Sequence, residues 1–69
     1  MKKWALRAKG AVMYECDDIY EALDWVGEHA DLSKKCNLIG GQPAYLVGWW
    51  WLPDGDVVGL ILNDLYKEA

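Results

Sequence analysis

The sequence has 69 residues, of which 54% are hydrophobic, and a formal net charge of −4. This length leaves room for a single domain, residues 1–69. The acidic total argues against general nucleic-acid binding, which depends on clustered Lys and Arg. No run approaches the ~18 apolar residues of a membrane helix, and Arg7 and Lys9 interrupt any apolar leader. We therefore expect a cytoplasmic protein with no membrane segment.

The first predicted element is a β-hairpin over residues 3–16. Residues 3–9 alternate between apolar and basic side chains, a period of two that predicts a half-buried strand. Residues 11–16 are again rich in strand formers, and the turn is placed at Lys9-Gly10. Because Lys-Gly is a weaker two-residue turn than Asn-Gly or Asp-Gly, a single bent strand is the alternative.

A helix is predicted over residues 19–30. Asp18 is a suitable N-cap, and Glu21 three residues later matches a capping box. The apolar side chains that recur at helical spacing are Ile19, Ala22, Leu23, Val26 and Ala30. The opposite side is acidic, with Glu21, Asp24 and Glu28. Trp25 lies at the border between the two sides.

Two shorter helical segments are predicted from capping residues. Asp31 or Ser33 can cap a helical turn that runs to Cys36, before residues 40–43 force a turn in the chain. Asn63-Asp64 can cap a terminal helical turn over residues 65–68.

The second predicted hairpin contains three consecutive tryptophans. Residues 44–52 form a nine-residue apolar run, residues 53–56 read Pro-Asp-Gly-Asp, and residues 57–62 are the return strand. Pro fixes φ at the first corner of the turn and Gly supplies a positive φ. The predicted fold is therefore α+β: a small antiparallel β-sheet in the order ββαββ packed on one helix, with a short C-terminal helical turn as an option.

Strand alternation divides the second hairpin into two apolar sides. One side carries Tyr45, Val47, Trp49 and Trp51, and the other carries Leu46, Gly48, Trp50 and Leu52. If the turn pairs Leu52 with Asp56, Ile61 joins the first side, and Gly59 lies across from Trp49, whose indole can then cover the bare backbone. The helix can cover one side only, and the leucine-rich side suits it best.

The other side therefore needs a cover, and three are considered. The first is the chain's own N-terminal hairpin or the segment 31–43. The second is a second copy of the chain or a partner protein, because Trp and Tyr often anchor protein interfaces. The third is a stacked nucleobase or sugar. The predicted interface consists of Tyr45, Val47, Trp49, Trp51 and Ile61.

The sequence contains few side chains that could bind a metal or take part in catalysis. His29, Cys16 and Cys36 match no familiar zinc spacing, so no metal, cofactor or catalytic site is expected. Both thiols are expected to be reduced, with a disulfide as the alternative. The acidic residues Glu21, Asp24 and Glu28 are read mainly as a solvated helix face, or as a secondary surface that engages a basic groove on another protein.

The sequence thus predicts a small acidic protein-interaction module rather than an enzyme. It would act as a homodimer, or as a binder or inhibitor of a larger partner, through the aromatic side of its sheet. The alternative is a domain that stacks a small ligand or nucleobase on the same Trp and Tyr side chains.

Overall fold

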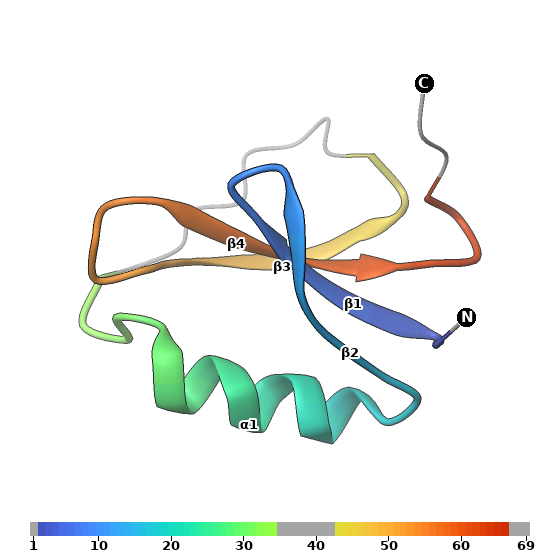
Figure 1. Ribbon diagram of the computed structural model, residues 1–69, viewed down its shortest axis with the longest axis horizontal. Helices are drawn as coiled ribbons and strands as arrows, with labels where there is room; N and C mark the ends of the chain where they lie inside the picture. The colour runs from blue at the N-terminus through green and yellow to red at the C-terminus, as the bar shows by residue number, and fades with distance from the viewer. Residues whose placement is uncertain (1, 35–42, 67–69) are drawn as a thin grey trace.

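The computed structural model describes residues 2–34 and 43–66. These residues form a four-stranded antiparallel sheet and one helix, which confirms the small α+β fold (Figure 1). The elements in chain order are β1 (Trp4–Ala8), β2 (Ala11–Cys16), α1 (Ile19–His29), β3 (Leu46–Trp51) and β4 (Val57–Leu62). The strands lie side by side in the order β2-β1-β4-β3.

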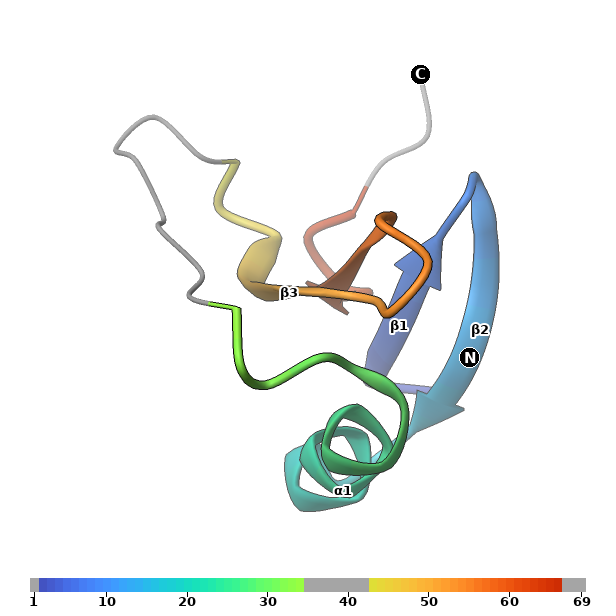
Figure 2. The same cartoon turned by 90° about the vertical axis from the view of Figure 1, so that its left-hand side faces the viewer.

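The N-terminal hairpin continues the sheet, because β1 pairs with β4 as well as with β2. It therefore lies in the same layer as the tryptophan strand. Of the covers considered for the second side of the sheet, this hairpin extends the sheet instead of forming a separate layer on it, and residues 35–42 of the segment 31–43 lie outside the described residues. The helix α1 lies on one side of the sheet, and residues 63–66 after β4 lie on the other (Figures 1 and 2).

The two hairpin turns have the predicted positions and contact each other. Lys9 and Gly10 both adopt positive φ, 55° and 76°, as a tight two-residue turn requires. Gly55 has φ 94°, and the Leu52 N–H donates to the Asp56 carbonyl at 2.7 Å. The Lys9 ammonium forms ion pairs with Asp54 and Asp56 across the two turns. Its hydrogen bond to Asp54 lowers the pKa of that carboxyl.

Both edge strands of the sheet contain a β-bulge. In β2 the register shifts so that Met13 has no partner in β1. In β3 the register shifts between Leu46 and Gly48, which leaves Val47 unpaired. Bulges of this kind interrupt the regular free edge of a sheet and hinder edge-to-edge aggregation.

The bulge in β3 corrects the predicted division of the second hairpin. Leu46 lies across from Ile61 and therefore shares the side of Trp49, not the side of Trp50. Val47, which was placed beside Trp49, is the bulged residue and is 45% exposed. The extra residue reverses the alternation, because side chains in a strand repeat every two residues.

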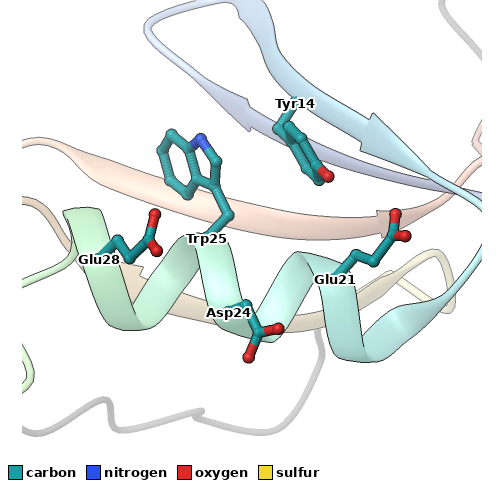
Figure 3. Close-up of a pocket in the computed structure, with 5 residues that line it drawn as sticks. All are labelled: Tyr14, Glu21, Asp24, Trp25 and Glu28. Carbon is teal, nitrogen blue, oxygen red and sulfur yellow. The ribbon is translucent and has the colours of Figure 1, made fainter.

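The helix begins at the predicted N-cap. The Asp18 side chain accepts a hydrogen bond from the Tyr20 N–H at 2.9 Å. Glu21 does not complete a capping box, since its side chain points toward Tyr14 on β2 (Figure 3). Of the predicted apolar stripe, Ala22 and Val26 are buried, whereas Leu23 is 40% exposed. The stripe is thus narrower than predicted.

The hydrophobic core lies between α1 and the sheet. Its buried members are Leu6, Ala8, Cys16, Ala22, Val26, Leu52, Val58 and Leu60. Trp50 is the member of the tryptophan triplet that packs against this core, as predicted for the leucine-rich side. In the part of the chain that the structure describes, no helix has the length and apolar character needed to cross a membrane.

The two shorter helical segments are not observed as helices in the described ranges. Residues 32–34 form a turn, and the rest of the predicted segment, including Cys36, lies outside the described residues. Residues 63–65 also form a turn, in which the Leu65 and Tyr66 N–H groups donate to the Leu62 carbonyl at 3.0 and 3.2 Å. Residues 67 and 68 of the predicted terminal helix are likewise outside the described ranges.

Candidate functional site

The side of the sheet opposite α1 is called the second face, and it carries most of the predicted interface. Cross-strand partners on this face form rows that run across all four strands. One row consists of Val12, Arg7, Gly59 and Trp49, and the next consists of Glu15, Ala5, Ile61 and Leu46. Ala5 and Ile61 are only 1% and 5% exposed, so the centre of this second row is buried, whereas Glu15 at its end is exposed. Ile61 therefore supports the predicted interface from below and is not itself accessible to a partner.

One end of the second face carries Trp49 and Trp51 and is partly accessible. Their rings form an edge-to-face pair with centroids 5.5 Å apart and planes at 76°. Both indoles are half-buried. Val47 and Val57 are 45% and 37% exposed. Lys34, whose ammonium is 5.9 Å from the Trp51 ring centroid, adds a positive charge beside the pair.

The backbone of β3 is capped at this end by the chain that follows the helix. The Asp31 N–H donates to the Trp51 carbonyl at 2.7 Å. This bond occupies an outward-facing acceptor of the edge strand, which makes simple strand addition at Trp51 unfavourable. A partner at this end would contact the side chains of the indole pair instead.

Two glycines in the hairpin are covered by side chains, although not as predicted. Trp49 lies across from Gly59, as expected. However, a Cβ on Gly59 would meet the Cδ1 of Leu46 at 3.0 Å, so Leu46 covers this backbone. The indole of Trp50 covers Gly48, where a Cβ would lie 3.1 Å from the ring. An indole over bare backbone is thus present, but on the helix side of the sheet.

The other end of the second face is an aromatic cluster around Tyr45. The rings of Tyr45 and Tyr66 meet edge to face, with centroids 5.0 Å apart. The Arg7 guanidinium lies 4.9 Å from the Tyr66 ring centroid. Sequence reasoning missed Tyr66, since no spacing or periodicity links a residue after β4 to one before β3.

A groove between α1 and β2 brings the predicted acidic residues together (Figure 3). It has a cavity volume of about 290 Å³ and is lined by Tyr14, Glu21, Asp24, Trp25 and Glu28. None of its three carboxylates forms an ion pair with a described cation. Burial, followed by the charge and hydrogen bonding of Glu21, raises the pKa of Tyr14. The periodicity of the helix predicted that the three acidic side chains lie together. It did not predict that Tyr14 and Trp25 line the groove with them.

In the described part of the chain, the reactive side chains of Cys16 and His29 are engaged in structural contacts, and Cys36 lies outside it. The Cys16 thiol is buried and donates to the Asp18 carbonyl at 3.0 Å. Burial is the main factor that raises its pKa, which disfavours the nucleophilic thiolate. His29 stacks on Trp25 with centroids 4.1 Å apart, and its Nδ1–H donates to the Trp25 carbonyl at 2.8 Å. Among the described residues, no three His, Cys, Asp or Glu side chains are grouped to hold a metal ion.

Comparison with known proteins adds no family to this geometry. No protein-family model matches the chain, and no curated protein or solved structure matches it either. The second face and the acidic groove are therefore the two candidate sites of function.

Proposed function

We propose that this protein is an interaction module that binds a second copy of itself or a larger partner protein through the second face. The observation that carries the proposal is the indole pair. Trp49 and Trp51 are partly exposed, and Val47 and Val57 in the same hairpin are exposed. Exposed apolar groups that adjoin one another favour association, and aromatic side chains are the commonest energetic anchors of protein interfaces.

The arrangement of the face supports a protein as the occupant. Leu46 and Ile61 are cross-strand partners on the same face as Trp49. The Tyr45 ring contacts Tyr66, which lies beside the Arg7 guanidinium. A rigid aromatic centre with a charged rim is the usual anatomy of a protein interface. We place this interaction in the cytoplasm, where Cys16 remains a thiol, and assign the protein no catalytic role.

Replacing Trp49 with Glu is expected to weaken self-association or partner capture by about 30-fold or more, because an anchoring aromatic contributes roughly 2 kcal/mol. Tyr20→Glu is the matched control, since Tyr20 is 72% exposed on α1, away from the second face. Light scattering over a range of concentrations measures self-association, and a pull-down from host lysate measures partner capture. A monomeric wild type that captures the same proteins as Trp49→Glu would contradict the proposal.

A small stacked ligand is the alternative occupant of the same indoles. Titration of the tryptophan fluorescence with nucleosides and sugars tests this alternative. Quenching that is lost in Trp49→Glu but kept in Tyr20→Glu would replace the protein partner by a ligand of that class. An unchanged spectrum with every compound would leave protein binding as the function.

The acidic groove favours a second candidate function, the binding of a Lys or Arg side chain from a basic partner. Three carboxylates, none of which is paired with a described cation, line the groove together with an indole and a phenol. Carboxylates and aromatic faces are the two kinds of group that hold a guanidinium or ammonium ion. The described acids do not gather into a metal site, so a bulky organic cation suits the groove better than a metal ion.

Glu21→Gln is expected to lower the affinity of the groove for a guanidinium ligand several-fold, through loss of one charge-assisted contact. The probe is N-acetyl-arginine amide, and the readout is the NMR shift of the Trp25 indole N–H. Asp64→Asn is the charge-matched control, because Asp64 is exposed in the turn that follows β4. Equal effects of the two substitutions would show general electrostatic attraction and no groove site.

A further inference from the structure

The turn after β4 has one firmly anchored residue, Asn63. Its N–H donates to the Lys3 carbonyl at 3.0 Å. Its side-chain amide donates to the Lys2 carbonyl at 2.7 Å and to a Glu15 carboxylate oxygen at 3.4 Å. These bonds fix Asn63 to the N-terminal hairpin, so the chain leaves the sheet from a defined point.

Beyond Asn63 the turn is attached to the rest of the molecule through the Tyr66 ring. The backbone bonds of Tyr66 go to Leu62 and Asn63, which are inside or next to the turn itself. Leu65 is 49% exposed. Among the described residues, the Tyr66 ring reaches beyond the turn to Tyr45, in an edge-to-face contact, and to the Arg7 guanidinium.

We propose that residues 64–66 form a detachable cap on the second face, with Asn63 as its hinge. In the closed state shown here, the Tyr66 ring occupies the surface of Tyr45 beside Arg7. In the open state, Tyr45 becomes accessible and the aromatic surface extends from the indole pair to Arg7. The cap thus competes with the binding partner for one end of the interface, an inference that rests on the function proposed above.

The strength of the closing contacts suits a reversible cap. An aromatic edge-to-face pair shifts an equilibrium about 2- to 13-fold, and an exposed cation–π contact about 2- to 5-fold. Together these two contacts contribute a factor of roughly 5 to 60 in favour of the closed state. The open state is then a minor but populated conformation, which a partner that binds Tyr45 can select.

The cap is tested with Tyr66→Ala, compared with Tyr66→Phe and Leu65→Ala. Tyr66→Ala removes the ring that closes the cap, whereas Tyr66→Phe keeps the ring and Leu65→Ala shortens an exposed side chain in the same turn. Anilinonaphthalene sulfonate reports the exposed apolar surface. We expect several-fold higher dye binding for Tyr66→Ala alone. Equal dye binding by Tyr66→Ala and wild type, or by Tyr66→Ala and Leu65→Ala, would overturn the proposal.

Native-state hydrogen exchange tests the cap in the wild type, without a substitution that could disturb folding. The amides of Leu65 and Tyr66 are expected to exchange through a local opening that is insensitive to low denaturant, far faster than the Leu60 amide in β4. Exchange of all three amides in a single global step would overturn the cap. Neither measurement needs a partner, so the cap can be supported even where Trp49→Glu shows that the second face does not associate.

Discussion

Replacing Leu60 with Ala is expected to leave a large fraction of the protein unfolded at 25 °C. Leu60 is 2% exposed and lies on the helix side of β4, one of the two central strands. Truncation of a buried Leu to Ala costs about 2–5 kcal/mol. The core of a domain of this size supplies roughly 3–5 kcal/mol in total, so a single cavity of this kind removes most of the stability.

Urea unfolding followed by far-UV circular dichroism measures this effect. Leu23→Ala is the matched control, because the same atoms are removed from a side chain that is 40% exposed on α1. The control is expected to change the free energy of unfolding by about 0.5 kcal/mol or less. If Leu60→Ala were as mild as the control, the core would not lie between α1 and the sheet.

The features that sequence reasoning predicted correctly depend on neighbouring residues. The N-cap at Asp18 requires a side-chain oxygen one or two residues before the helix, and that oxygen bonds the Tyr20 N–H as expected. The turns at Lys9-Gly10 and Gly55 require positive φ, which Gly tolerates. Such local signals lie within four residues of the structure that they specify.

The features that sequence reasoning missed depend on pairing between distant strands. The bulge at Val47 arises where β3 is fitted to β4, and Gly48 is a local signal for a bulge that does not by itself fix the register. Its effect is to exchange the expected positions of Leu46 and Val47. The pairing of β1 with β4 also joins segments about fifty residues apart in sequence, and it places the N-terminal hairpin beside the tryptophan hairpin.

The candidate surfaces also combine features that the local sequence predicts with features that depend on tertiary contacts. Helical periodicity placed Glu21, Asp24 and Glu28 on one side of α1, and the structure brings all three to one groove. Tyr14 joins them because β2 lies against α1, which is a tertiary relation. The contact of Tyr66 with Tyr45 likewise depends on how the turn after β4 leaves the sheet.

Single substitutions of Trp49 and Trp50 by Ala are expected to show which of the two indoles belongs to the core and which to the proposed interface. Trp50 packs against the helix-side core, and its indole covers Gly48. Its loss is expected to cost about 3 kcal/mol, the lower end for a truncated large aromatic, since the ring is half-buried. Trp49→Ala mainly removes the edge-to-face contact with Trp51, which is worth about 0.5–1.5 kcal/mol.

The comparison of Trp50→Ala with Trp49→Ala in urea unfolding therefore tests the basis of the functional proposal. Residues 49 and 50 are adjacent and of the same type, so chain position and residue type are matched. A large loss of stability at Trp50 with a small loss at Trp49 means that the second-face indole is dispensable for folding and is available for binding. If Trp49→Ala destabilised the protein as strongly, the second face would be part of the core, and the reason for assigning a partner to it would no longer hold.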